Sequence, residues 1–334
     1  MRVLVIGGAR FVGKQLAHRL VLRGDRVTLL NRGSQDDGLG AAVERVVADR
    51  GTDAFDHALA GRTFDAVVDF AAFHAADAER ASRVLSGRVG HYLFVGTGQV
   101  YLVRQGCPTP SREEDYDGPL MAPPEDARDH AEWAYGVGKR GAEDVLAEAF
   151  ERTGFPATRM RIPVLHGPGD PHRRIERLVA RALDGGPLLV PRPDALVRHV
   201  HGPSLARWMV ERLGDTRWIG EAVNVAPESA CTVREMVSLI ADGCGSRAAR
   251  LEVEPELLAS VGWRAEDVCP FGGRWSSVLD PSRAVRSLGF AHPTVDAWLP
   301  GVLDAVLAHH DPVPPADVVR HRASELALAR RLGA

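Results

Sequence analysis

Tyr135 and Lys139 are the residues whose types and spacing suggest chemistry most directly. They lie four residues apart in the segment WAYGVGKR, so on a helix their side chains share one face. An ammonium group beside a phenol favours the phenolate, and we expect Lys139 to lower the pKa of Tyr135 from its usual value of about 10. Tyr135 would then serve as an acid or base near neutral pH. A Tyr-x-x-x-Lys pair in isolation is common, so its meaning depends on its surroundings.

Thr97 is the third residue expected to take part in the chemistry. It follows the apolar segment His91–Val95, which is predicted to be a strand. Ligands of open parallel sheets bind where the strands end, so the Thr97 hydroxyl is expected to hydrogen-bond a substrate oxygen beside Tyr135. The alternative is a threonine in an ordinary turn. We predict a catalytic group made of Thr97, Tyr135 and Lys139.

A glycine-rich segment near the N-terminus, GGARFVG, predicts a dinucleotide site. It joins an expected strand, Arg2–Ile6, to an expected helix, Phe11–Arg23, which would place backbone N–H groups and the positive helix end at a pyrophosphate. Gly7 permits the tight turn, and Gly13 permits close packing of helix on strand. Two glycines alone are a weak signal, and the strand and helix around them strengthen it. Arg10 stands where such loops usually carry glycine.

The end of the second expected strand, Arg26–Asn31, indicates which dinucleotide binds. NAD-binding sites of this kind place a carboxylate there for the ribose 2′-hydroxyl. This chain has Asn31 and Arg32 instead; the amide does not repel a 2′-phosphate, and the guanidinium can pair with one. We therefore favour NADP over NAD, with Arg10 expected nearby, although solvated loop arginines are the alternative. Asp49, after the third expected strand, is either a partner of the adenine amino group or a turn residue.

The elements that must position these residues alternate between apolar strands and helices. Further strands are expected at Arg45–Ala48, Phe64–Phe70 and Ala157–Leu165, with helices notably at Ala75–Ser86 and Asp129–Thr153. This alternation predicts an α/β fold, a Rossmann-type doubly wound parallel sheet that helices cover on both faces.

The pattern changes after residue 165, where proline and glycine become frequent. Thr232 and Glu235 have the spacing of a capping box ahead of an apolar helical segment. We predict a dinucleotide-binding Rossmann domain over residues 1–165, to which segments near 200–226 return. Residues 166–334 are predicted to form mainly a smaller α+β substrate-binding domain.

Composition excludes several classes of function. The chain has 334 residues, 45% hydrophobic and 25% charged, with a net charge of -3, so it lacks the basic excess that holds nucleic acid or an anionic membrane. Its four cysteines, at positions 107, 231, 244 and 269, have no CxxC spacing, and we expect no metal site and a reducing, cytoplasmic setting. No apolar run reaches 18 residues, so no membrane span is expected.

Taken in order, these motifs resemble the extended short-chain dehydrogenase/reductase family of the NAD(P)-dependent epimerase/dehydratase type, in a divergent branch with a GGARFVG loop. The resemblance covers nearly the whole chain, since RIPVLHGPGD at 161–170, Val200-His201 and Asp280–Ala284 match later segments of the family in order. It implies hydride transfer between a nicotinamide and a hydroxyl or keto carbon of a sugar, nucleotide-sugar or related metabolite. Tyr135 would transfer the proton, Lys139 would tune it and bind the nicotinamide ribose, and Thr97 would position the reacting oxygen.

The resemblance also implies two sets of binding residues and a homodimer. The cofactor set is Gly7, Arg10, Phe11, Val12, Gly13, Asn31, Arg32, Asp49, Arg50, Ala71, Tyr135, Lys139 and Ile162. The substrate set is Gln99, His166 and Arg198. The dimer would pair the helices near Ala75–Ser86 and Asp129–Thr153 across a two-fold axis.

Departures from the family limit the reactions that we expect of this chain. Sugar 4,6-dehydratases place Asp-Glu after the catalytic threonine, whereas this chain has Gly98-Gln99, which cannot exchange the proton that elimination of water needs. Arg198 stands one place late and Ser204 replaces an expected aspartate, so nucleotide-sugar recognition is less secure than the fold. An NADP preference slightly favours a reductase over an epimerase. The alternative is a non-catalytic protein of the same fold that binds dinucleotide or RNA, which the acidic net charge and the complete catalytic group oppose.

Overall fold

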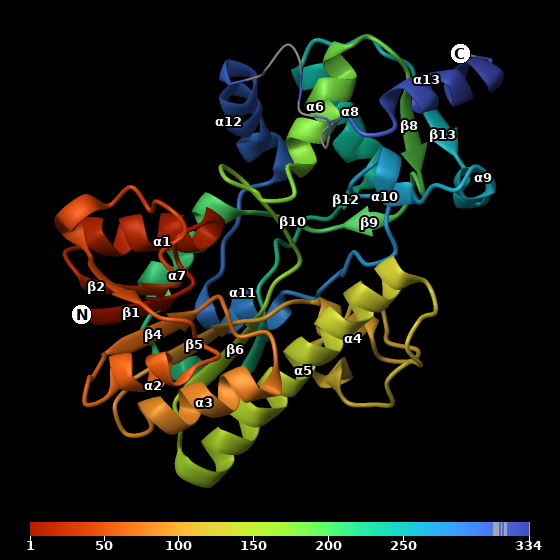
Figure 1. Cartoon of the computed structure of the whole chain (residues 1–334). Coiled ribbons are helices and arrows are strands. Elements are labelled where there is room, and N and C mark those ends of the chain that lie inside the picture. The colour runs from red at the N-terminus through yellow and green to blue at the C-terminus, as the bar shows by residue number, and fades with distance from the viewer. Residues whose placement is uncertain (310–313, 315, 317–318, 334) are drawn as a thin grey trace. The chain divides into compact units, whose positions relative to one another are not determined.

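Short apolar segments form a parallel sheet in the computed structural model, which describes residues 1–309, 314, 316 and 319–333 (Figure 1). The sheet has seven strands in the order β11-β6-β5-β4-β1-β2-β3. Their bounds are β1 (Arg2–Ile6), β2 (Arg26–Asn31), β3 (Glu44–Val47), β4 (Ala66–Asp69), β5 (Tyr92–Val95), β6 (Ala157–Arg161) and β11 (Ala222–Asn224). All neighbouring strands run parallel, which confirms the predicted doubly wound sheet.

The order of the strands reverses beside β1. From β1 the chain adds β2 and β3 on one side, and it then crosses back to add β4, β5 and β6 on the other. Such a switch point leaves a crevice at the carboxyl ends of the central strands, where ligands of open α/β sheets bind. The segments that follow β1, β2, β4 and β5 are therefore the ones that position the site.

Helices cover both faces of this sheet. On one face lie α1 and α7, which pack together, and on the other lie α2, α3 and α5 (Figure 1). The helices of this part are α1 (Phe11–Leu22), α2 (Asp53–Leu59), α3 (Ala75–Leu85), α4 (Gln99–Leu102), α5 (Ala127–Thr153), α7 (Gly202–Arg212) and α11 (Ser282–Leu288). The carboxylate of Asp126 caps α5 by accepting from the N–H groups of Arg128 and Asp129, and the helix ends at Gly154 with a φ of 70°. These caps place the Tyr-x-x-x-Lys segment inside one continuous helix.

Contacts divide the chain into two compact units. Unit 1, which contains the sheet, consists of Met1–Pro163, Gly202–Glu228 and Ser277–His292. Unit 2 consists of Val164–His201, Ser229–Ser276 and Pro293–Ala334. The return of Ser277–His292 to unit 1 was not predicted, because nothing in its local pattern distinguishes it from the segments around it.

In the part that the structure describes, unit 2 combines helices with three two-stranded sheets, which pair β10 with β7, β12 with β9 and β13 with β8. Its strands are β7 (Val164–His166), β8 (Leu188–Pro191), β9 (Leu196–Val197), β10 (His199–His201), β12 (Cys231–Thr232) and β13 (Arg250–Val253). Its helices are α6 (Arg174–Leu183), α8 (Val233–Gly243), α9 (Pro255–Ser260), α10 (Ala265–Val268), α12 (Val295–Ala308) and α13 (Arg322–Arg331). The predicted capping box starts α8, where the Glu235 N–H donates to the Thr232 hydroxyl at 3.1 Å.

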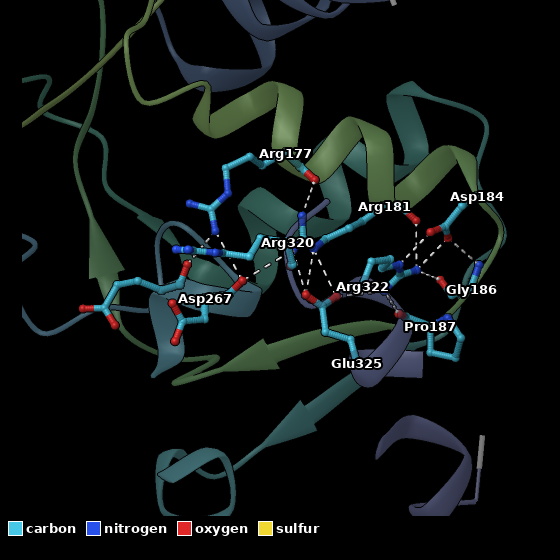
Figure 2. A network of polar contacts seen from close by, with 10 residues as sticks. Arg177, Arg181, Asp184, Gly186, Pro187, Asp267, Arg320, Arg322 and Glu325 are labelled. Carbon is cyan, nitrogen blue, oxygen red and sulfur yellow. Dashed lines mark hydrogen bonds and ion pairs between the residues drawn. The ribbon is translucent and has the colours of Figure 1, made fainter. Parts of the chain in front are cut away.

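Buried charges attach the last helix of unit 2 to α6 (Figure 2). Arg181 of α6 and Glu325 of α13 form an ion pair at 2.7 Å, and both side chains are at most 2% exposed. Arg322 of α13 pairs with Asp184 at 2.6 Å and with Glu325 at 3.1 Å. Burying a charge is costly unless it is paired. Moving α13 away would leave the buried Arg181 without its carboxylate partner, so the network stabilises the position of α13 against α6.

One predicted strand is divided in two. The sequence predicts a strand over Ala157–Leu165, but β6 ends at Arg161 and β7 begins at Val164 in the other unit. Pro163 lies between them and has no N–H group to continue a strand ladder.

We find no candidate membrane-spanning helix among the residues that the structure describes.

Candidate active site in unit 1

The turn between β1 and α1 is packed too closely for side chains at its glycines. Gly7 has a φ of +79°, and a Cβ there would lie 2.9 Å from the Cβ of Ala71. A Cβ on Gly13 would lie 2.8 Å from the Cα of Gly8. These contacts bring the first turn of α1 directly beside the end of β1, the arrangement on which a dinucleotide pyrophosphate binds.

A pocket of about 490 Å³ opens at the carboxyl ends of β1 to β4. It brings together seven residues that the sequence assigned to the cofactor, namely Gly7, Arg10, Asn31, Arg32, Asp49, Arg50 and Ala71. Phe73 and His74, which follow β4, also line it. Sequence reasoning missed these two, although their place just after a central strand was a usable signal.

Two guanidinium groups border this pocket without a fixed partner. Arg10 and Arg32 are both exposed, and neither side chain forms a hydrogen bond or ion pair with any residue that the structure describes. Asn31 holds the turn that contains Arg32, since its side-chain oxygen accepts from the Gly33 N–H at 2.7 Å. The exposed Asp49 likewise holds its own turn by accepting from the Gly51 N–H at 2.8 Å. Both arginines are available to an anion such as a phosphate.

Arg50 also borders the pocket, but its guanidinium is already paired with carboxylates. It donates to both oxygens of Asp69, at 2.7 and 2.8 Å, and it pairs with Asp77 at 3.2 Å. Asp69 ends β4, is completely buried, and also accepts a hydrogen bond of 2.5 Å from the Tyr92 hydroxyl. Arg50 therefore shapes the wall of the pocket through this buried network, which the sequence did not reveal.

The predicted catalytic group assembles at the carboxyl end of β5. Thr97 follows the strand, and its hydroxyl lowers the pKa of the Tyr135 phenol on α5, which places the two groups near each other. Lys139 is 2% exposed, and its ammonium donates to the carbonyl oxygen of Val95 at 2.9 Å. The same ammonium lies 4.8 Å from the centroid of each of two aromatic rings, those of Phe73 and Phe94.

The electrostatics of this group differ from the prediction. Burial raises the pKa of Tyr135; the Thr97 hydrogen bond lowers it, and the charge of Glu132 raises it further. The expectation that Lys139 lowers the pKa of Tyr135 below its usual value is therefore wrong. The physical reason is that desolvation of the phenol dominates, while the ammonium is directed at the Val95 carbonyl. Burial also lowers the pKa of Lys139 itself, to about 8.

Gly98 and Gln99 occupy fixed positions beside Thr97. A Cβ on Gly98 would lie 2.7 Å from the Cβ of Ser277, so no carboxylate side chain fits there. The side-chain amide of Gln99 donates to a carboxylate oxygen and to the backbone oxygen of Glu132, both at 2.7 Å. Gln99 was predicted to contact substrate, and its amide nitrogen is instead hydrogen-bonded to Glu132, a residue that sequence reasoning missed although it precedes Tyr135 by three positions on one helix.

The remaining predicted residues lie in the two units as follows. In unit 1, Val12 is buried in α1, Phe11 begins that helix with a φ of 46°, and the carbonyl of the buried Ile162 accepts from the Gly98 N–H at 2.9 Å. In unit 2, His166 is fully buried, and its ring contacts His199, Phe271 and Trp298. Arg198, also in unit 2, lies half-buried between β9 and β10.

Comparisons with known proteins point to one family. A sequence model of the NAD dependent epimerase/dehydratase family matches residues 3–226, whereas a search of curated proteins finds no significant match. A dTDP-glucose 4,6-dehydratase from Bacillus anthracis, solved with NAD, has a TM-score of 0.73 at 17% identity, over 93% of this chain and 97% of that one. A UDP-glucuronic acid 4-epimerase from Bacillus cereus, solved with UDP-glucuronic acid and NAD, has a TM-score of 0.70 at 16% identity, over 93% of this chain and 100% of that one.

A dTDP-glucose 4,6-dehydratase from Streptomyces venezuelae, also solved with NAD, has a TM-score of 0.70 at 20% identity, over 92% of this chain and 98% of that one. At these identities the solved structures establish the shared fold. The family match spans the sheet, the glycine turn and the segment from Thr97 to Lys139. The chain therefore belongs to the NAD dependent epimerase/dehydratase family.

Proposed function

We propose that this protein is an NAD(P)-dependent oxidoreductase acting on a hydroxyl or keto carbon of a sugar, nucleotide-sugar or related metabolite, with reduction favoured over epimerisation. The observation that carries the proposal is the group at the end of β5. There, the Thr97 hydroxyl acts on the Tyr135 phenol, and the buried Lys139 lies one helical turn further along α5. A phenol near a hydroxyl at a strand end is placed to exchange a proton with a substrate oxygen.

The residues around the pocket fit a dinucleotide cofactor. The glycine turn leaves no space for a Cβ at Gly7 or Gly13, and the adjoining pocket of about 490 Å³ suits the adenosine end. The bound dinucleotide would supply or accept the hydride. Lys139, which would hold the nicotinamide ribose, has one of its three N–H donors on the Val95 carbonyl.

We favour NADP as that cofactor because of charge. Arg10 and Arg32 border the pocket with no described partner, and the end of β2 carries Asn31 in place of a carboxylate. Two guanidinium groups attract a 2′-phosphate, which a carboxylate would repel. The structural neighbours were solved with NAD, so a preference for NADP would set this chain apart from them.

The substrate class rests on the family and on Gly98. Solved neighbours are described as nucleotide-sugar enzymes, one of them bound to UDP-glucuronic acid. The tight contact of Gly98 with Ser277 leaves no room for an acidic side chain beside Thr97, which argues against elimination of water through a residue at that position. A reductase or an epimerase fits better, and the favoured NADP suits a reductase, which must exchange its cofactor in each turnover.

We also propose a homodimer that pairs α3 and α5 across a two-fold axis. Analytical sedimentation of the purified protein would test this assembly.

The test of this proposal is Tyr135→Phe. The variant keeps the ring and loses only the hydroxyl, so we expect it to bind NADPH as the wild type does and to lose NADPH-dependent reduction of keto-sugars by about 100-fold or more. The measurement combines a fluorescence titration of NADPH with an absorbance assay over a panel of nucleotide-linked keto-sugars. Wild-type turnover that persists in Tyr135→Phe would refute the proton role. A protein that binds neither NADPH nor NADH would refute the cofactor assignment.

A further inference from the structure

Phe73 is a partly exposed aromatic residue that borders both the pocket and the predicted catalytic group. It follows β4, is 43% exposed and lines the pocket of about 490 Å³. The Lys139 ammonium lies over its ring, 4.8 Å from the centroid, and the centroid of the Tyr135 ring lies 6.3 Å away. Single exposed phenylalanines are common on protein surfaces, so a role for Phe73 depends on what its ring contacts and on how the ring is held there.

A carboxylate holds the backbone around Phe73. Asp77, in the first turn of α3, accepts from the N–H groups of Phe73 and His74 at 2.8 and 3.1 Å. The same carboxylate pairs with Arg50 at 3.2 Å, and Arg50 pairs with the buried Asp69 at the end of β4 at 2.7 Å. The segment that carries the ring is therefore tied to the edge of the sheet through a chain of ion pairs.

A glycine in α5 lets this segment approach Lys139. A Cβ on Gly138 would lie 2.6 Å from the backbone oxygen of Phe73 and 2.7 Å from the Nδ1 atom of the His74 ring. Gly138 directly precedes Lys139, so the backbones meet at the point where the lysine side chain leaves the helix. A larger residue at position 138 would push the Phe73 segment away from the ammonium.

The Lys139 ammonium is buried beside two aromatic rings. It is 2% exposed and donates to the Val95 carbonyl at 2.9 Å, while the centroids of the Phe73 and Phe94 rings each lie 4.8 Å from its nitrogen. Removing an ammonium from water is costly, and the face of an aromatic ring within about 6 Å attracts a cation most strongly where water is excluded. The two rings therefore stabilise the ammonium at the Val95 carbonyl.

The two rings differ in what else they contact. Phe94 lies within β5 and is completely buried, so removal of its ring would leave a cavity in the core. Phe73 is part of the pocket wall, and a change there alters the cover of the ammonium while the core stays filled. Phe73 is therefore the ring whose contribution to Lys139 can be measured separately from stability.

We propose that Phe73 is a positioning residue, whose ring covers the Lys139 ammonium and holds it at the Val95 carbonyl for the nicotinamide half of the dinucleotide. The inference rests on the proposed function, in which Lys139 holds the nicotinamide ribose. Without the ring, water would reach the ammonium and the side chain would gain freedom, which must be lost again when the cofactor binds. The adenosine half does not depend on Lys139 in this account.

Calorimetric titrations of Phe73→Leu with NADPH, NADH and 2′,5′-ADP test the proposal. Leucine remains apolar and removes the ring face. We expect the affinities for NADPH and NADH to fall by the same factor, about 2- to 30-fold. The affinity for 2′,5′-ADP, which has no nicotinamide ribose, should stay as in the wild type.

Two further variants serve as controls in these titrations. Phe73→Tyr keeps an aromatic face over the ammonium and should bind all three ligands as the wild type does. Phe150→Leu is the matched control for loss of a phenylalanine, because Phe150 is 37% exposed on α5 and lies outside the pocket. It should also leave the three affinities unchanged.

The contact between ring and ammonium can be measured without a ligand. The chain has only two lysines, Lys14 and Lys139, so labelling with ¹³C-lysine gives two sets of side-chain signals, and Lys139→Met identifies that of Lys139. Protons over the face of an aromatic ring resonate upfield. The ε-protons of Lys139 should therefore lie upfield of those of Lys14, and they should move downfield in Phe73→Leu but not in Phe73→Tyr.

Equal NADPH affinities of wild type and Phe73→Leu, with equal thermal unfolding midpoints as a check of the fold, would overturn the proposal. A loss of 2′,5′-ADP affinity as large as that of NADPH would also overturn it, because the ring would then act on the adenosine half. So would Lys139 signals that do not move in Phe73→Leu. The proposed function fails in a different way: a wild-type protein that binds neither NADPH nor NADH would refute the cofactor assignment and, with it, the ribose contact of Lys139.

Discussion

Replacement of Arg32 by alanine tests the assignment of the 2′-phosphate. Arg32 is exposed, borders the pocket and has no partner among the described residues, so its removal leaves no buried group unpaired. A hydrogen bond between charged groups contributes about 1.5–3 kcal/mol. Its loss should weaken NADPH binding by about 10- to 150-fold. NADH has no 2′-phosphate, and its affinity should change by less than about threefold.

The assay is a pair of fluorescence titrations, with NADPH and with NADH, on wild type and Arg32→Ala at one fixed salt concentration. Arg88→Ala is the matched control, because Arg88 is exposed, lies outside the pocket and has no described side-chain partner. We expect that control to bind both dinucleotides as the wild type does. Equal losses of NADPH and NADH affinity in Arg32→Ala would show that the residue does not contact the 2′-phosphate, and the reasoning from charge would then be refuted.

Three further predictions follow from packing, buried charge and pH. Gly98→Asp should lower the free energy of unfolding by about 1–3 kcal/mol, because its Cβ would lie 2.7 Å from that of Ser277; an unchanged unfolding midpoint in urea would contradict this. Glu325→Ala leaves the buried Arg181 without its carboxylate partner and should cost about 3–5 kcal/mol in chemical denaturation; a loss below about 1 kcal/mol would show that the ion pair is replaceable. Burial lowers the pKa of Lys139 to about 8, below its unfolded value of about 10.4, so between these pH values the unfolded chain binds the extra proton and stability rises with pH. Lys139→Met should lack this rise, about 3 kcal/mol in all, and parallel curves of stability against pH for the two proteins would contradict the assignment.

Local sequence patterns predicted the sheet because their physical cause is local. The strand β5 is buried at every position, so it appears in the sequence as an unbroken apolar run. The division of the expected strand at Pro163 was harder to predict from the sequence. Proline marked a possible break, but the transfer of the chain to unit 2 at Val164 depends on contacts with distant segments. The return of Ser277–His292 to unit 1 has the same origin.

The site was predictable where glycine and strand ends define it. Gly7 and Thr97 come just after predicted strands and Asn31 ends one, and the structure places all three at the carboxyl edge of the sheet. The link from Gln99 to Glu132 joins α4 to α5, and the ion pair of Arg50 with Asp69 joins the segment after β3 to the end of β4. Neither contact has a local sequence pattern.

The predicted direction of the Tyr135 pKa shift was wrong for a related reason. Helical spacing places Lys139 on the same face as Tyr135, but spacing does not reveal that its ammonium donates to the Val95 carbonyl. Nor does it reveal how much water is excluded from the phenol. Both facts depend on how α5 packs against the end of β5, which only the folded structure provides.

Identification of the dinucleotide that accompanies the purified protein tests the central claim most directly. Freshly purified protein would be denatured, any released dinucleotide would be identified by mass spectrometry, and the native protein would then be titrated with NADPH. The account predicts little retained cofactor and a site that binds NADPH more tightly than NADH, as a reductase that exchanges its cofactor requires. Stoichiometric NAD in the purified protein would contradict it and would indicate an epimerase-like cycle, in which Arg10 and Arg32 have no phosphate to bind.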